Sequence, residues 1–321
     1  MKCRWIVATV IAVACERRAP PPAPSVAPPA AAPAEASSIP EPRTLLSLPT
    51  SAYHATIAAA DDDAVLLTPT AAYRLAPGRD PERTPLDLGT VATATPSSFI
   101  HWARGAIVES PRSRTTGSAS RRIAALSDPP QAIVAAGGRI AWLVRSRDGR
   151  ASIQSPGGKT TRTVYASPGT IDAIAMGSDA IYFVERPAGA DWRIGTVQAD
   201  GGAPAFTPLR KGRAPSMLVA RGDLFYYEGN GQEVRRLSPD LQHERSLASG
   251  FVCSPIAVSA HVYCAQVEGL FELRVDERPR RLVPGGPARL VADLAATPKR
   301  LLWIVDAGPD RLEVRELALP P

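Results

Sequence analysis

The chain consists of short apolar stretches separated by polar or glycine-containing turns. In one recurring group an aliphatic residue is closely followed by an aromatic one, as in "RIAWLV" (139–144) and "AIYFVE" (180–185). Large side chains in these stretches recur at every second position, which is the period of a β-strand. After residue 42 we find no stretch of useful length with the helical period of about 3.6 residues, so the pattern predicts an all-β fold. The other members of the group are "FIHWAR" (99–104), "DLFYYE" (223–228), "HVYCAQ" (261–266) and "RLLWIV" (300–305), and "AVLLT" (64–68) occupies the same place in the repeat without an aromatic residue.

These stretches are the second strands of a four-strand repeat that recurs about every 40 residues. A small apolar inner strand precedes each of them. A third strand follows, and then a more polar fourth strand that is rich in arginine and threonine. The chain contains seven inner, seven second and seven third strands, but only six fourth strands come after them. The inner strands are predicted at 54–60, 91–95, 132–136, 171–176, 216–220, 255–259 and 288–293.

The missing fourth strand stands at the other end of the sequence. "PRTLLSLPTS" (42–51) is similar to the fourth strands "ERSLAS" (244–249) and "PRRLVPG" (279–285), yet it precedes the first inner strand. An N-terminal strand that completes the last sheet closes a ring of sheets and removes exposed edges. We therefore predict a seven-bladed β-propeller of four-stranded antiparallel blades over residues 43–321, with six or eight blades as alternatives.

One large side chain from each second strand is expected to pack between neighbouring blades, because alternate residues of a strand face the same side of its sheet. An aromatic stripe that binds sugars is the alternative interpretation. The predicted column consists of Leu67, Trp102, Trp142, Phe183, Tyr226, Cys264 and Trp303.

The N-terminus has the features of a secretory signal. Lys2 and Arg4 precede an apolar run over residues 5–14, which is shorter than the roughly 20 residues of a membrane-spanning helix. The run ends in "AVAC", which resembles the lipobox of bacterial lipoproteins, although Ala12 stands where leucine is commoner. The resemblance implies removal of residues 1–14 and lipidation of Cys15. An ordinary signal peptide with an incidental cysteine is the alternative.

Residues 15–42 are rich in proline and alanine and have no apolar periodicity, so they are predicted to be a disordered tether. At about 3.1 Å per residue the fully extended tether would reach on the order of 80 Å. Glu16 after the cysteine favours the outer membrane in organisms that sort as enterobacteria do. The predicted location is therefore the cell envelope, at the periplasmic face of the outer membrane or the cell surface.

The repeat also resembles a known group of propellers. The second-strand pattern, followed by the turns "SPGG" (155–158) and "ADGG" (199–202), is similar to secreted bacterial lipoproteins with YncE- or TolB-like propellers. The Gly-His and Trp-Asp signature of WD40 repeats and the glycine pairs of kelch repeats are absent from the sequence.

Composition changes this picture little. The net charge is +6, the 33 prolines are unusually many, and nearly all basic residues are arginine, a bias typical of a GC-rich genome. No basic stripe interleaved with aromatic residues is present, so we predict no nucleic-acid partner.

The sequence offers few residues for catalysis. The four histidines fall in different blades, and no metal-binding spacing, nucleophile elbow or phosphate loop is found. "ADDDAV" (60–65) occupies a turn between strands, with a calcium site as the alternative. The inner strands and the loops leading into them are mostly Ala, Val, Ser, Thr and Pro. We therefore predict a binding or scaffold protein with no enzymatic activity, cofactor or metal. A hydrolase or lyase with a site in the central channel and a purely structural subunit of an envelope complex are the alternatives.

Three loops that should share one face are basic: 145–150, 186–193 and 210–215. Guanidinium groups bind carboxylates and phosphates through two hydrogen bonds. The pattern predicts a monomeric body that binds a protein or an anionic envelope polymer there, with a solvated basic surface as the alternative. The candidate residues are Arg145, Arg147, Arg186, Arg210, Lys211 and Arg213.

Two cysteines remain in the predicted body, Cys253 and Cys264. An even pair in an oxidising compartment favours a disulfide. The register of a simple hairpin argues against the disulfide, because Cys264 would face Ala257. Cys253 would then lie about 13 Å further along the strand. The Cα atoms of a disulfide are at most roughly 7 Å apart. The sequence leaves open a disulfide, with the connector folding back, and two buried thiols.

Overall fold

The computed structural model describes the chain from residue 40 to residue 320, apart from short gaps. The described ranges are 40–50, 54–60, 63–86, 91–112, 119–158, 160–187, 191–229, 232–250, 252–285, 291–308 and 310–320. They belong to one compact unit, Ile39–Pro321. The predicted signal peptide, Cys15 and nearly all of the predicted tether lie outside the described residues.

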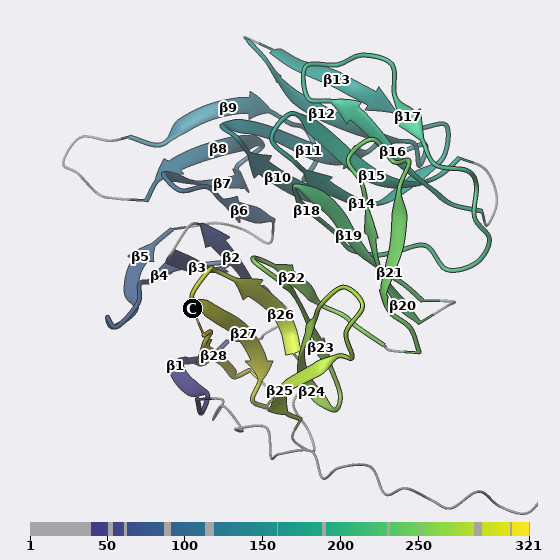
Figure 1. Ribbon diagram of the computed structural model, residues 1–321. Coiled ribbons are helices and arrows are strands. Elements are labelled where there is room, and N and C mark those ends of the chain that lie inside the picture. Colours follow the sequence, from purple (N-terminus) through teal and green to yellow (C-terminus); the bar gives the residue numbers. More distant parts are fainter. Residues whose placement is uncertain are drawn as a thin grey trace, which may run out of the picture. The chain divides into compact units, whose positions relative to one another are not determined.

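The described residues form 28 strands in seven antiparallel sheets of four strands each (Figure 1). Blade 1 contains β2 (Thr56–Ala60), β3 (Asp63–Thr68), β4 (Ala71–Leu75) and β5 (Glu82–Pro85). Blade 2 contains β6 (Ala92–Ala94), β7 (Ser98–Ala103), β8 (Ala106–Pro111) and β9 (Arg121–Ala125). Blade 3 contains β10 (Ala132–Ala136), β11 (Arg139–Arg145), β12 (Ala151–Gly157) and β13 (Thr160–Ala166).

The other four blades have the same order of strands. Blade 4 contains β14 (Thr170–Met176), β15 (Ala180–Arg186), β16 (Arg193–Gln198) and β17 (Ala205–Phe206). Blade 5 contains β18 (Leu218–Arg221), β19 (Asp223–Glu228), β20 (Glu233–Leu237) and β21 (Glu244–Ala248). Blade 6 contains β22 (Ile256–Val258), β23 (Val262–Gln266), β24 (Gly269–Leu273) and β25 (Arg280–Pro284). Blade 7 contains β26 (Val291–Ala296), β27 (Arg300–Asp306), β28 (Leu312–Ala318) and β1 (Arg43–Leu48).

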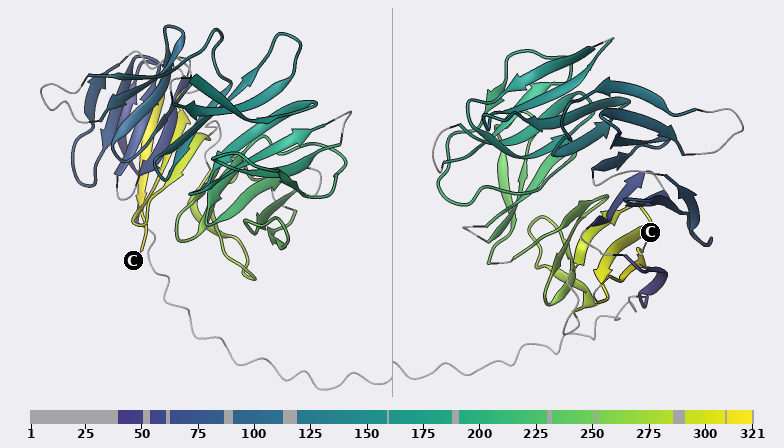
Figure 2. Two further views of the ribbon diagram at one scale, coloured as in Figure 1. Left: turned by 90° about the horizontal axis from the view of Figure 1, so that it is seen from above. Right: turned by 180° about the vertical axis from the view of Figure 1, so that it is seen from behind.

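The seven sheets form a ring. Each inner strand contacts the inner strand of the next blade, and β26 of the last blade contacts β2 of the first. The two turned views in Figure 2 show the same succession of sheets from other sides. The predicted all-β propeller with seven four-stranded blades is therefore confirmed.

The predicted closure by an N-terminal strand is also confirmed. β1 is the outer strand of blade 7 and pairs with β28 from Arg43 opposite Glu316 to Leu48 opposite Leu312. An ion pair of 2.5 Å joins Arg43 to Glu316, whose other carboxylate oxygen lies 3.0 Å from Arg300. Arg300 in turn donates a 2.7 Å hydrogen bond to the Leu75 carbonyl of blade 1. The buried Glu316 and Arg300, together with the exposed Arg43, thus tie the closing strand to its own blade and to the first blade.

The hydrophobic core is divided among the seven contacts between blades, with one apolar cluster at each. Trp142, Phe183, Tyr226, Cys264 and Trp303 are buried and face the preceding blade, as predicted.

The same column was predicted one residue out of register in blades 1 and 2. Leu67 packs with Phe99 of the following blade, and Trp102 lies half-buried against the cluster between blades 2 and 3. Counted from the hairpin turn, Leu66 and His101 occupy the positions equivalent to Trp142. Choosing the largest side chain of each second strand gave the wrong position in these two blades. A shift of one residue along a strand moves the side chain to the other face of the sheet.

The last inner strand begins and ends three residues later than predicted. Residues 288–293 were expected, but β26 spans Val291–Ala296. Thr297 closes a tight turn, with its amide donating to the Arg300 carbonyl at 2.8 Å and its hydroxyl accepting from the Arg300 amide at 3.0 Å. The first half of the segment 294–299 ("LAATPK"), which follows the predicted inner strand, is therefore strand and not turn.

The direction of the strands defines two faces of the ring. The turns from inner to second strands and from third to fourth strands lie on one face. We call it the N-terminal face, because the chain enters β1 there at Arg43. The opposite face carries the turns from second to third strands and the connections between blades, and we call it the crossover face. Among the described residues, no helix has the length and apolar character needed to cross a membrane.

Candidate functional site

Four of the six predicted basic residues are exposed on the crossover face. Arg145 ends β11, and Arg147 follows in a turn that is held by the Ser146 amide donating to the Arg150 carbonyl at 2.9 Å. Lys211 and Arg213 lie in the connection between blades 4 and 5. These four residues lie in two segments of the crossover face, one in blade 3 and one in the connection between blades 4 and 5.

The remaining two predicted residues are partly buried and are paired with other side chains or rings. Arg186 forms a 2.6 Å ion pair with Asp172 of the inner strand in the same blade. Arg210 is fixed by two backbone hydrogen bonds with Trp192, of 2.7 and 2.8 Å, and its guanidinium lies 5.3 Å from the Trp192 ring. Neither arginine is a freely solvated cation, so the predicted patch is smaller than expected.

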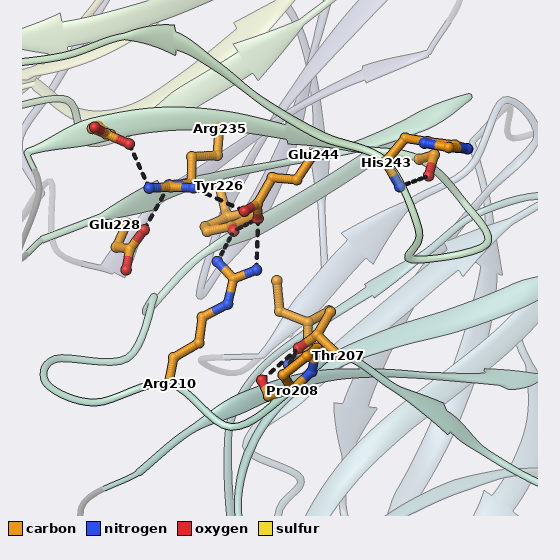
Figure 3. Close-up of polar contacts among 11 residues, drawn as sticks. Thr207, Pro208, Arg210, Tyr226, Glu228, Arg235, His243 and Glu244 are labelled. Carbon is orange, nitrogen blue, oxygen red and sulfur yellow. Dashed lines mark hydrogen bonds and ion pairs between the residues drawn. The ribbon is translucent and has the colours of Figure 1, made fainter.

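Arg210 belongs to a polar cluster that joins blades 4 and 5 (Figure 3). Its guanidinium donates to the Tyr226 hydroxyl at 2.7 Å and to Glu244 Oε1 at 2.8 Å. The Tyr226 hydroxyl also hydrogen bonds to Glu244, and Arg235 donates to Glu244 Oε2 at 2.8 Å. The Nε atom of Arg235 lies 2.6 Å from Oε2 of Glu228. The cluster consequently uses both oxygens of Glu244 and the fully buried Tyr226 to bridge two blades.

Electrostatics keep this cluster ionised. Burial acts to raise the pKa of Glu244, but the Tyr226 and Arg210 hydrogen bonds and the charges of Arg210 and Arg235 outweigh it, so this pKa lies below its usual value. Burial and the hydrogen bond to Glu244 raise the pKa of Tyr226, which therefore stays protonated. With Glu244 charged and Tyr226 neutral, the two groups are fixed as an acceptor and a donor.

Blade 4 contains a second cluster of this kind, which reaches into blade 3. Glu185 is fully buried and accepts hydrogen bonds from Tyr165, from Ser167 at 2.6 Å and from Arg193 at 2.8 Å. The Arg193 guanidinium lies 3.6 Å from the centre of the Phe206 ring. Burial, followed by the hydrogen bond to Glu185, raises the pKa of Tyr165.

The other buried glutamates are paired in the same way. Glu272 contacts Arg274 at 2.9 Å and Arg280 at 3.7 Å, and Glu313 contacts Arg315 at 2.8 Å. A carboxylate that accepts hydrogen bonds from arginines has few lone pairs left for a substrate. The Glu185 and Glu244 clusters join neighbouring blades, whereas the Glu272 and Glu313 pairs each lie within one blade.

Histidines and acidic turns do not form a metal site in the described structure. His101 is buried, with its Nε2 atom 3.1 Å from Ser110 Oγ, and His261 lies 3.4 Å from Glu272. Asp63 of the acidic turn pairs with Arg74 at 2.7 Å, while residues 61 and 62 lie outside the described residues. Within the described ranges, no three His, Cys, Asp or Glu side chains gather closely enough to hold a metal ion.

The two cysteines of the body form a disulfide in the structure. Cys264 faces Ile256 across the hairpin, and the Cα atoms of Cys253 and Cys264 are 5.5 Å apart. The Ser254 amide donates to the Ala265 carbonyl at 3.0 Å, so the connector folds back along β23. The separation of about 13 Å between Cys253 and Cys264 was expected for a strand that continues straight. It is not observed, because the residues before β22 do not extend that strand.

The N-terminal face carries a groove that the sequence analysis missed. It has a volume of about 390 Å³ and lies where blades 2, 3 and 4 meet. Four arginines from two of these blades line it: Arg121, Arg122, Arg139 and Arg162. They come from three different strands, so spacing along the chain gives no sign of the cluster, and only the register of the blades places them together.

Exposed apolar side chains were also missed. Leu209, Val252 and Val267 are exposed in loops of the crossover face, and the side chain of Val267 has 82% of its surface accessible. They are isolated in the sequence and follow no period. The connections between blades bring them to the same face as the exposed cations.

The molecule is therefore a seven-bladed β-propeller with a basic and partly apolar crossover face. No protein-family model and no curated protein sequence matches the chain. Among solved structures, the β-propeller domain of Cps50 (Swd1) from Myceliophteria thermophila matches with a TM-score of 0.61 and 10% identity, covering 86% of this chain and 99% of that one. The WD40 β-propeller domain of Doa1 matches with a TM-score of 0.57 and 10% identity, covering 86% and 96%. At this identity the likeness extends to the fold alone.

Proposed function

We propose that this protein is a lipid-anchored, non-enzymatic binding or scaffold protein of the bacterial cell envelope, and that its crossover face binds a partner protein. One observation carries the proposal: exposed cations and exposed large apolar side chains share that face. Three of the four large apolar residues that are exposed in the described ranges lie there. Protein interfaces combine apolar contact with arginine, whereas scattered solvated charges alone would not need the apolar residues.

The anchor is supported by the sequence. The apolar run 5–14 and the "AVAC" motif place Cys15 where bacterial lipoproteins carry their lipid. The chain reaches the propeller at Arg43 on the N-terminal face, opposite the crossover face.

The non-enzymatic role is supported by the polar clusters. Glu185, Glu244 and Glu272 are engaged with arginines that connect strands and blades. Asp293 has the raised pKa typical of some catalytic acids, but both of its oxygens accept backbone hydrogen bonds, from Ile57 and Leu294 at 2.9 Å each. A hydrolase or lyase with a central-channel site and a purely structural subunit are the competing functions.

Two measurements in intact cells test the proposal. Labelling with an alkyne fatty acid should mark the wild-type protein, and Cys15→Ala should abolish the label. A photo-crosslinking residue at Arg147 or Lys211 should capture one defined protein, whereas the same residue at Arg278 on the N-terminal face should not.

A label that survives Cys15→Ala would refute the anchor. Equal capture from Arg147 and Arg278, or no capture from either, would refute the crossover face as the binding surface. A crosslink to a polysaccharide in place of a protein would transfer the proposal to an anionic envelope polymer.

A further inference from the structure

The groove on the N-terminal face has an unusual charge arrangement. Arg121 and Arg122 begin β9 of blade 2, and Arg139 and Arg162 come from β11 and β13 of blade 3. Glu109 neutralises Arg121 through a 2.6 Å contact. Among the described residues Arg122 has no carboxylate partner, and its side chain is exposed. The groove therefore contains the guanidinium of Arg122, without a carboxylate partner in the described ranges, in addition to those of Arg139 and Arg162.

A carboxylate of the protein already occupies part of this groove. Asp200, in the third-to-fourth-strand turn of blade 4, lies 3.1 Å from Arg139 and 3.9 Å from Arg162. Its side chain is 75% exposed, so its ion pairs are screened by water and weak. A carboxylate from another molecule can therefore replace Asp200 at small cost. Arg162 is held in place meanwhile by a 3.0 Å hydrogen bond to the Ala199 carbonyl.

The lining of the groove also contains a buried hydroxyl without a partner. Ser155 is 4% exposed, and among the described residues its Oγ atom has no hydrogen-bond partner. Buried polar groups are nearly always hydrogen bonded, so an unpaired one at the wall of a groove points to a ligand. Ser155 stands opposite Arg162 in the β12–β13 register, which places donor groups of two kinds side by side.

The rest of the lining indicates the class of ligand. Ile123, Ile140 and Pro156 provide apolar contact between the arginines, and none of the described residues that line the groove is aromatic. Sugars are commonly bound on aromatic faces, whereas an extended peptide alternates side chains and can present carboxylates to the arginines and aliphatic groups to the walls.

We propose that this groove binds an acidic peptide segment of a partner protein. One carboxylate of the segment replaces Asp200 on Arg139 and Arg162, and a second one binds Arg122. Aliphatic side chains between them contact Ile123 and Ile140, and the Ser155 hydroxyl donates to the bound segment. This site is distinct from the crossover face and does not depend on lipid anchoring.

Fluorescence anisotropy with the purified, unlipidated Cys15→Ser protein tests the site. The probe is a dye-labelled hexapeptide of alternating glutamate and leucine, and the matching glutamine–leucine peptide is the control. Arg122→Ala with Arg139→Ala should weaken probe binding at least tenfold and leave the melting temperature nearly unchanged. Asp200→Asn should strengthen it several-fold, because it removes the nearer of the two carboxylates that pair with Arg139, the other being Asp179 at 3.8 Å.

Matched variants away from the groove separate this site from general attraction by a basic protein. Arg79→Ala with Arg278→Ala changes two exposed arginines in the third-to-fourth-strand turns of blades 1 and 6, removes the same charge and should change binding less than twofold. Asp148→Asn, which also removes one exposed carboxylate, should leave binding unchanged. Equal losses from both arginine pairs, or no loss from the groove pair, would overturn the proposal. Tighter groove-dependent binding of tri-galacturonate than of the peptide would overturn the peptide class.

Discussion

At the scale of single residues, the fold depends on glutamates buried with arginines. Glu244 is surrounded by Arg210, Arg235 and the Tyr226 hydroxyl, and it links blade 4 to blade 5. Such a group adds stability only while all its partners remain, because a half-buried charge without a counter-charge is costly. The identity of single residues in these clusters therefore matters more than the number of ion pairs on the surface.

Removing the charge of Glu244 should destabilise the propeller. Glu244→Gln leaves Arg210 and Arg235 facing each other without a carboxylate, and we expect a loss of about 2 kcal/mol in the free energy of unfolding. Glu109→Gln is the matched control, because Glu109 pairs with the exposed Arg121 and should cost under about 1 kcal/mol. Urea denaturation of the three proteins measures the difference. Similar midpoints for the two variants would contradict a structural role for the Glu244 cluster.

Asp293 should make stability depend on pH. Burial raises its pKa from 3.8 to about 6, although the Ile57 and Leu294 amides oppose this. The folded protein therefore binds this proton more tightly than the unfolded chain. The resulting stabilisation is complete below about pH 4 and is lost as the pH rises through about 6, by on the order of 3 kcal/mol. Asp293→Asn removes the titration, so the stability of the variant relative to wild type should rise between pH 4 and pH 7. Parallel pH profiles of the melting temperature would contradict this.

Residue-level roles were the hardest to predict from the sequence. Arg186 and Arg210 were expected to be solvent-facing cations, but their partners Asp172 and Glu244 lie 14 and 34 residues away. No local spacing reveals such pairs. The groove arginines escaped notice for the same reason, since each is an ordinary polar residue of its own strand.

At the scale of the strand, the closing strand β1 is the element with the largest expected effect. Its removal would expose the edge of β28 and delete the Arg43–Glu316 ion pair. Deletion of residues 16–40 should leave a cooperatively folding body, whereas deletion of residues 16–49 should cause aggregation or non-cooperative melting. Calorimetry and size-exclusion chromatography of the two truncated proteins measure this. Equal melting of both would mean that β1 contributes no closure.

Strands were predicted well because their signals are local. Alternation of apolar residues and turn residues located every blade, and the count of fourth strands revealed β1. Two exceptions have specific causes. In blade 7, hydrogen bonds of Thr297 make the turn between the inner and second strands shorter than predicted. In blades 1 and 2, Leu67 and Trp102 were assigned to the wrong face of their strands because they are among the largest side chains there. Hairpin register, which decides the face of each side chain, depends on turn geometry that the apolar pattern does not encode.

At the scale of the whole molecule, the ring separates two surfaces of different character. The crossover face combines exposed cations with Leu209, Val252 and Val267, and the N-terminal face carries the arginine-lined groove. The sequence predicted the first surface in part, from its basic loops. The second surface results from placing three blades side by side, so it became visible only with the complete ring.

The pairing of β1 with β28 also sets the order in which the chain can fold. Arg43 and Glu316 are 273 residues apart, so the first strand to be synthesised must wait for the last one. Blades 1 to 6 can assemble in sequence from local hairpins, but blade 7 is completed only after β28 has emerged from the ribosome. A chain interrupted before β28 would leave β1 unpaired and open to proteases. Closure of the ring therefore requires a chain that is intact from Arg43 to Glu316.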